Sequence, residues 1–420
     1  MKKIVQILMV LCLIAPSLTH AQTNTSDVKI AFIRDGHLWL KVDDKEVKIT
    51  KEKATYNYPP QWSFDGKMLL YQKEVAGNIR DPKGTSNELW VYDVATKKHQ
   101  KIFHDGYNAK WSPIENIVAF SDGRVLNISD LTRFYNIALG VNDYEWQPDG
   151  KGFITSSSAS FRPDGWTHTI IYTISIEDGY QNINDLTKNV KRLFVIPKEI
   201  TKDDVKVDAL NAGKFSYSPN KQWITFIVSD TPSGAMDSEM LCVISVDGKE
   251  FIVIDEVIND FTPKWAFHNS LLGYIAGEGR IVFGFKNKNL KVTELPATQT
   301  VNLTPQNYAE LGFSWVNDVS LIVSRVPESE WSDDANKRPK PVLYLLSLTN
   351  PKQIQITKPP KGQGDFTPIF LPSINKITWS RQKDLVSFKG DLWVADPTGD
   401  HAKVWVHDIG LELYDFFPSQ

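Results

Sequence analysis

The chain returns eight times to one short phrase: an aromatic residue, two or three turn-forming residues, and an alternating apolar run. The clearest copies begin at Trp62, Trp111, Trp146 and Tyr217, and weaker copies begin at Trp265, Trp315, Phe370 and Phe416. A period of about 50 residues with four short strands in each unit is typical of a β-propeller. A single small sheet cannot bury both of its faces, so the units must stack around a common axis. The repeat therefore predicts an all-β fold.

Residues 60–104 show how one unit divides into strands. The segments PQWS, KMLLYQKE, ELWVYDV and HQKIF read as four strands, and Asp65-Gly66 forms a tight turn between the first two. Asp-Gly favours such turns because glycine adopts positive φ without strain and aspartate bonds to its own backbone. By the same reading, further units begin near residues 109, 144, 215, 263, 313 and 368.

The two ends of the repeat region are incomplete in complementary ways. Val28 to Thr50 supplies three strands without a preceding aromatic strand, and Leu411 to Gln420 supplies an aromatic strand with nothing after it. Joining them in one sheet would satisfy edges that otherwise stay unpaired. We therefore expect one propeller domain over residues 22–420, with eight four-stranded antiparallel blades and a ring closed by the C-terminal strand. Seven blades is the alternative, if the short unit at 109–140 is irregular.

The first 21 residues have the features of a signal peptide. Lys2 and Lys3 precede the apolar run Ile4 to Ile14, and Thr19-His20-Ala21 is a suitable cleavage site. The run is short for a membrane span. We expect a secreted, extracytoplasmic protein of the cell envelope or periplasm, without a transmembrane span after cleavage; a retained N-terminal anchor is the alternative.

Charge and cysteine content exclude some classes of function. Loss of Lys2 and Lys3 would move the formal net charge from −3 to −5, and no basic cluster is present. Nucleic acid is therefore not an expected partner. Of the two cysteines only Cys242 would remain, in the apolar segment MLCVISV, so no intramolecular disulfide is expected.

The phrase Pro60-Gln61-Trp62-Ser63-Phe64-Asp65-Gly66-Lys67 resembles the repeat of the TolB-like β-propeller family, a WD40-like repeat. Unit endings at Ile49-Thr50, Leu303-Thr304 and Ile356-Thr357 fit the same pattern. The resemblance implies a propeller fold, which occurs in binding proteins, peptidase propellers and some lyases. Two departures limit it: the α/β domain that precedes the TolB propeller is missing, and no Gly-x-Ser-x-Gly motif is present for a hydrolase domain.

Two insertions break the rhythm of the fourth unit, at residues 156–168 and 188–212. Long loops on repeat scaffolds often carry function, and an extra hairpin without a binding role is the alternative. A third polar loop covers residues 327–341. Three residues in these segments are candidate contacts for a partner: Arg162, Trp166 and Trp331. The Trp residues of the repeat itself are expected to pack between neighbouring sheets instead.

Acidic residues recur just before the first strand of several units. They are Asp105, Asp143, Asp260, Glu310, Asp365 and Asp415. If these segments run toward the central channel, six carboxylates meet at its mouth and would bind a divalent cation or a basic peptide. The alternative is that each carboxylate caps the turn that enters its strand. No other cofactor is expected, since the motifs for nucleotides and zinc are missing and the histidines are scattered.

These observations favour an exported, non-catalytic propeller that binds a protein, peptide or glycan at one rim or in the channel. The alternative is an extracellular propeller hydrolase or lyase that acts on a peptide or polysaccharide. We assign no catalytic residue.

Overall fold

The computed structural model describes residues 28–77, 82–230, 238–257, 262–277, 284–384, 389–409 and 413–418. The predicted signal peptide and Asp260 lie outside these ranges. The described chain is built from antiparallel strands, with two short 3-10 helices, η2 (Tyr180–Asn182) and η3 (Pro372–Ile374). Among these residues no helix is long and apolar enough to cross a membrane.

Six sheets have four strands each. One sheet combines three strands from the start of the described chain with one from its end: β1 (Lys29–Arg34), β2 (His37–Val42), β3 (Lys45–Lys48) and β36 (Tyr414–Phe417). The next sheet consists of β4 (Gln61–Trp62), β5 (Met68–Ala76), β6 (Thr85–Asp93) and β7 (Lys98–Phe103). The sheet after it consists of β8 (Tyr107–Trp111), β9 (Val118–Asp122), β10 (Val125–Ser129) and β11 (Phe134–Leu139). The other three are β12 (Asp143–Trp146), β13 (Gly152–Ser157), β16 (Ile170–Ser175) and β17 (Val190–Val195); β28 (Tyr308–Asn317), β29 (Ser320–Pro327), β30 (Val342–Ser347) and β31 (Ile354–Gln355); β32 (Gly364–Leu371), β33 (Lys376–Gln382), β34 (Gly390–Ala395) and β35 (Lys403–Ile409).

A seventh, eight-stranded sheet consists of two four-strand groups. The first contains β20 (Asn211–Tyr217), β21 (Trp223–Ser229), β22 (Glu239–Ser245) and β23 (Phe251–Val257). The second contains β24 (Lys264–Trp265), β25 (Leu271–Ala276), β26 (Asn289–Glu294) and β27 (Gln299–Asn302). One residue pair, Val257 with Ala276, joins the two groups. The 109–140 unit forms a four-stranded sheet, β8 to β11, with register shifts between Leu126 and Asn127 and between Tyr107 and Lys110.

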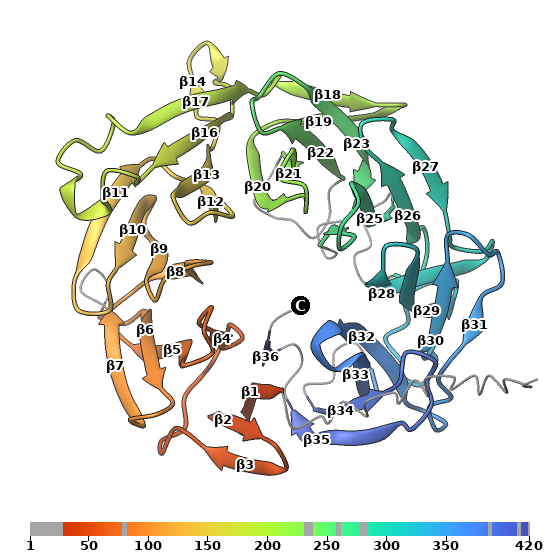
Figure 1. Ribbon diagram of the computed structural model, residues 1–420. Coiled ribbons are helices and arrows are strands. Elements are labelled where there is room, and N and C mark those ends of the chain that lie inside the picture. Colours follow the sequence, from red (N-terminus) through yellow and green to blue (C-terminus); the bar gives the residue numbers. More distant parts are fainter. Residues whose placement is uncertain are drawn as a thin grey trace, which may run out of the picture.

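Figure 1 shows these sheets arranged around a common centre, with β8, β12, β20, β28, β32 and β36 facing it. Four-stranded antiparallel sheets in radial array are the architecture of a β-propeller. Strand β36 pairs with β1, Phe416 opposite Ile30 and Tyr414 opposite Phe32, so the last described strand completes the sheet begun by the first.

The insertions in the fourth unit form two additional hairpins. One is β14 (Phe161–Arg162) with β15 (Gly165–Trp166), and the other is β18 (Glu199–Lys202) with β19 (Val205–Asp208). The expectation that all of 188–212 is an insertion was wrong in part, because β17 within it is the outermost strand of that sheet. Its sequence, VKRLFV, does not alternate between apolar and polar residues and none of its residues is fully buried, so the sequence pattern did not indicate this role.

The repeated turn residues satisfy the backbone at the start of each unit. The Ser63 hydroxyl donates to Asp65 Oδ1 at 2.8 Å and accepts the Met68 amide at 3.0 Å. Ser218 has the same role, with Asn220 in place of the aspartate. The motif thus replaces backbone hydrogen bonds that the tight turn cannot make.

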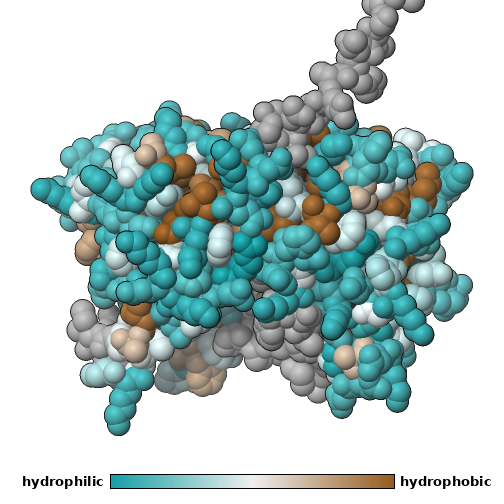
Figure 2. Space-filling view, turned by 90° about the horizontal axis from the view of Figure 1, so that it is seen from below, coloured by the Kyte–Doolittle hydropathy of each residue, from teal (hydrophilic) through white to brown (hydrophobic). Residues whose placement is uncertain are grey.

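The unit endings have an equally specific cause. Thr50, Thr304 and Thr357 each accept, through Oγ1, the amide of a residue on the preceding strand, at 3.0, 2.8 and 2.9 Å. This bond ties the end of the outermost strand back to its sheet. On the outside, hydrophilic side chains cover most of the face seen in Figure 2, and hydrophobic ones appear there in separate groups.

Candidate functional site

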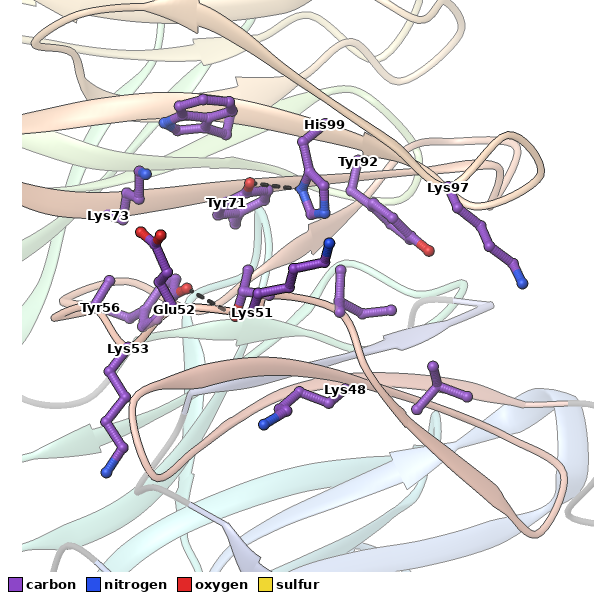
Figure 3. Close-up of a pocket in the computed structure, with 15 residues that line it drawn as sticks. Lys48, Lys51, Glu52, Lys53, Tyr56, Tyr71, Lys73, Tyr92, Lys97 and His99 are labelled. Carbon is purple, nitrogen blue, oxygen red and sulfur yellow. Dashed lines mark hydrogen bonds between the residues drawn. The ribbon is translucent and has the colours of Figure 1, made fainter.

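A cleft lies where the end of β3 meets the next sheet, β4-β5-β6-β7. Its volume is about 570 Å³, within the range of ligand-binding pockets. One wall is the segment from Val47 to Ala54, and the other comes from β5, β6 and β7 (Figure 3). The segment is fixed in place by Ala54, whose amide donates to Gly36 O, and by a bridge between Thr55 and Glu74.

The floor of the cleft is aromatic. Tyr71 lies opposite Trp90 and Tyr92 lies opposite His99 in the strand register, so four rings gather on one face of the sheet. The Tyr71 and Trp90 rings are stacked at 6.4 Å, and the Tyr92 and His99 rings lie 4.8 Å apart. Tyr56 completes the floor from the other wall, 6.4 Å from Tyr71. The three tyrosines are buried.

A hydrogen bond of 2.8 Å joins Tyr71 Oη to His99 Nδ1, as Figure 3 shows. Burial raises the pKa of the Tyr71 phenol, so this group keeps its proton at neutral pH. Burial also lowers the pKa of His99, against the effect of a backbone hydrogen bond with Ile49, and the nearby Lys73 charge lowers it further. A neutral imidazole can accept the phenol proton at Nδ1. The pair is therefore uncharged at neutral pH.

The rim of the cleft is basic. Five lysines line it against one acidic residue, Glu52. Lys73 has a carboxylate partner, with Nζ 3.7 Å from Glu88 Oε2, and lies 4.5 Å from the centre of the Trp90 ring. The other four have no ion pair within the described part of the chain: Lys48, Lys51, Lys53 and Lys97. The Lys51 side chain extends toward the His99 ring in Figure 3. An aromatic floor under uncompensated ammonium groups suits an anionic ligand with an apolar part.

This cleft was not predicted from the sequence. His99 was placed among scattered histidines, and Tyr56, Tyr71 and Tyr92 were given no role. The available signal was the density of lysines in KEVKITKEK, residues 45–53, beside a unit whose strands carry Tyr, Trp and His at alternate positions.

The six acidic residues are not equivalent in the structure. Asp143, Glu310, Asp365 and Asp415 lie within the innermost strands β12, β28, β32 and β36, whereas Asp105 lies between β7 and β8. Asp260 lies outside the described residues. Within the described ranges, no three His, Cys, Asp or Glu side chains gather as they would to hold a metal ion.

Two of these carboxylates are neutralised by arginines on the adjacent strand. Arg325 bonds Glu310 through Nε at 2.7 Å, and Arg381 bonds both oxygens of Asp365, at 2.6 and 3.0 Å. Trp379 adds a third bond to Asp365 at 2.9 Å. Both carboxylates are fully buried. Each of these two charges is therefore compensated within its own sheet.

Asp143 and Asp415 instead accept backbone and amide donors, several of them across sheet boundaries. Asp143 accepts hydrogen bonds from Asn108 Nδ2 at 2.8 Å and from the Lys214 backbone amide at 2.6 Å. These two bonds connect three neighbouring sheets. Asp415 accepts a hydrogen bond from the backbone amide of Trp62 at 2.9 Å. Burial raises the pKa of Asp415 to about 6, although its backbone hydrogen bonds lower it. Asp105 accepts the amide of Asn87, on β6 of the preceding sheet, at 2.9 Å.

The insertion residues differ in exposure. Arg162 and Trp166 are exposed on the β14–β15 hairpin, where Trp166 packs against Phe161 with ring centroids 5.0 Å apart. Trp331 is half-buried, because it stacks on Phe285 and the Arg338 guanidinium lies 3.7 Å from its ring centre. Its indole is thus largely occupied by internal contacts.

No protein-family model matches the sequence, and a comparison with curated protein sequences gives no match. Solved structures do match. A eukaryotic initiation factor aligns at 11% identity over 92% of this chain and 87% of its own, with a TM-score of 0.57. A puromycin-hydrolysing peptidase of Mycobacterium tuberculosis aligns at 13% identity over 83% of this chain and 53% of its own, with a TM-score of 0.51.

A puromycin hydrolase gives similar values, with 10% identity, 84% of this chain, 54% of its own and a TM-score of 0.50. The chain spans about half the length of these peptidases. At such low identity, the matches show a shared fold only.

Proposed function

We propose that this chain is an exported, TolB-like binding propeller. Its ring has eight blades, closed by the pairing of β36 with β1, and residues 1–21 direct it to the cell envelope. It binds a protein, peptide or glycan partner there without transforming it. The peptidase and initiation-factor matches support the fold of this proposal and leave its activity open.

One observation carries the binding role: the cleft between β3 and the β5–β7 sheet. It combines about 570 Å³ of space, four clustered aromatic rings and a rim of uncompensated lysines. A cleft of this composition can desolvate an apolar group while its rim attracts charge.

The test is to block the cleft without changing its charge. Val47 lies on its wall and is 53% exposed, so Val47→Trp should add bulk at the entrance without disturbing the core. Binding of a panel of acidic, neutral and basic peptides and glycans is measured by calorimetry for the wild type and the variant. We expect at least one probe to bind the wild type and to weaken in Val47→Trp. Binding that is identical in both proteins would contradict the proposal.

The second candidate is an enzyme, a hydrolase or lyase, and the Tyr71–His99 pair is the observation that favours it. A phenol and a neutral imidazole joined at 2.8 Å in a cleft can relay a proton. Turnover of peptides and polyuronates, with and without divalent metal, tests it. Activity that is lost in both Tyr71→Phe and His99→Gln would establish the enzyme, whereas wild-type inactivity on the whole panel would count against it.

The acidic set remains a separate proposal. Asp105, Asp143, Asp260, Glu310, Asp365 and Asp415 would border a central opening that binds a cation or a basic segment. Glu310 and Asp365 are already ion-paired, so we assign most of the proposed cation or peptide binding to Asp105 and Asp143, which are only half-buried. Arg162, Trp166 and Trp331 would add an outer contact. Calcium or magnesium binding by Asp105→Asn and Asp143→Asn variants checks the first part.

A further inference from the structure

We propose that the ligand of this cleft is an acidic peptide segment, bound in extended form along the edge of β3; the inference rests on the binding role proposed above. Its first basis is charge. The whole chain has 50 acidic and 47 basic residues, so it carries a small net negative charge. The cleft reverses that balance, with five lysines and one glutamate. An acidic partner would be drawn to this surface in preference to the remainder of the molecule.

The second basis is the state of those lysines. Some lysines of the chain, such as Lys110 and Lys291, meet carboxylates at 2.7 and 2.8 Å, whereas single exposed ones such as Lys358 have no ion pair within the described ranges. The rim lysines Lys48, Lys51, Lys53 and Lys97 have no such partner among the residues described. Lysine is a flexible point charge, unlike the bidentate arginine fork. A rim of separate lysines therefore suits carboxylates spaced along a chain.

The third basis selects a peptide over a glycan. β3 stands at the edge of its sheet and pairs with β2 alone in the described structure. Its outer side therefore presents unpaired N–H and C=O groups, to which an extended peptide can add as a further strand. Val47 and Lys48 belong to β3 and also line the cleft. A peptide on this edge would direct alternate side chains toward the lysines and the aromatic floor. A glycan cannot form that backbone ladder.

The experiment uses the full mature chain and a fluorescein-labelled, capped octapeptide of alternating Glu and Thr. Anisotropy should show saturable binding that weakens as salt is raised. The Gln counterpart should bind roughly tenfold more weakly. A version N-methylated at alternate residues keeps the charge but blocks strand addition, and it should lose binding. Equal binding of all three peptides would overturn the inference.

A matched pair of variants assigns the charge to the cleft. Lys51→Gln/Lys53→Gln removes two rim lysines, and we expect roughly tenfold weaker binding. Lys358 and Lys361 follow β31 as Lys51 and Lys53 follow β3, in the related sequences ITKPPK and ITKEK, and both are exposed. Lys358→Gln/Lys361→Gln should leave binding unchanged. If both pairs weaken binding equally, the peptide recognises net charge and the inference fails.

A third set of measurements distinguishes a failure of the peptide inference from a failure of the proposed binding role. Oligogalacturonate and heparin are titrated beside the peptide. If either glycan binds more tightly than the peptide and Val47→Trp weakens it, the cleft is a binding site but its ligand is not a peptide. If Val47→Trp changes the binding of no probe, the proposed function itself fails. If nothing binds, the lysines only guard the β3 edge against pairing, and both proposals fall.

Discussion

The indole nitrogen of Trp111 donates a hydrogen bond of 3.0 Å to the backbone carbonyl of Gln61, on the neighbouring sheet. Gln61 directly precedes Trp62, the repeat aromatic of that sheet. Trp146 bonds in the same way to Lys110 O at 3.3 Å, and Trp315 to Lys264 O at 2.9 Å. At these three positions the repeated tryptophan thus does more than fill space between sheets, because it links its unit to a fixed backbone position of the preceding one, whereas Trp62 Nε1 has no hydrogen-bond partner in the described part of the chain.

Replacing Trp111 should therefore separate packing from hydrogen bonding. Trp111→Ala leaves a cavity between sheets and should lower the free energy of unfolding by about 3–5 kcal/mol. Trp111→Phe keeps most of the ring and loses the bond, so a smaller loss, above about 1 kcal/mol, is expected. Equilibrium urea denaturation measures both. A Trp111→Phe variant as stable as the wild type would show that the bond contributes nothing.

The two insertion tryptophans provide a contrast of exposure. Trp166 is 40% exposed on a hairpin, so Trp166→Ala should change the stability by less than about 0.5 kcal/mol. Trp331 is held between Phe285 and Arg338, and Trp331→Ala should cost clearly more. The same denaturation experiment compares them. A reversed order would mean that the internal contacts of Trp331 are not stabilising.

The Asp365–Arg381 pair predicts destabilisation when one partner is removed. Asp365→Asn leaves the Arg381 guanidinium, only 10% exposed, without its counter-charge and should cost about 3–5 kcal/mol. Replacing both residues by leucine should restore much of the loss, since a well-packed apolar pair is often neutral. A thermal unfolding series on the wild type and these two variants tests this. An Asp365→Asn variant more stable than the wild type would contradict it.

Asp415 predicts a particular pH dependence. Its pKa is raised from 3.8 to about 6, so between those values the folded protein binds more protons at this site than the unfolded chain does. Its contribution to stability should therefore fall as the pH rises from about 4 to 6. Asp415→Asn should remove that component, so the wild-type and mutant curves of unfolding free energy should converge in acid. Parallel curves would contradict the raised pKa.

Strand β36 should be required for a stable fold. Deleting Leu411–Gln420 removes Tyr414 and Phe416 from a core cluster and leaves the β1 edge unpaired. We expect aggregation or a large fall in the thermal midpoint. Light scattering and calorimetry detect these outcomes, and a truncated chain that melts like the full-length protein would refute the expectation.

The fold was largely predictable because each unit signals its own structure. The Ser63–Asp65 turn, the Thr50 ending and the aromatic at Trp111 are local features whose hydrogen bonds lie within or next to one unit. The β17 strand was missed because its sequence does not alternate between apolar and polar residues and it lies at the outer edge, where none of its residues is fully buried. There, little burial is available to impose an apolar pattern.

The cleft was not predictable for a related reason. Its walls come from two units, and Lys51 and His99 are brought together only by the way the segment after β3 crosses onto the next sheet. The partners of the acidic residues were equally hidden. Arg381 meets Asp365 by strand register, which a spacing of acidic residues alone does not reveal.

The pairing of β36 with β1 also sets the order of events during folding. Strands such as β5 and β6 can meet early, because few residues separate them. The sheet of β1 must wait for a segment at the far end of the chain, and closing so long a loop costs about 5 kcal/mol in entropy before its contacts form. Such non-local pairings slow folding, so β36 is expected to dock last and to limit the overall rate.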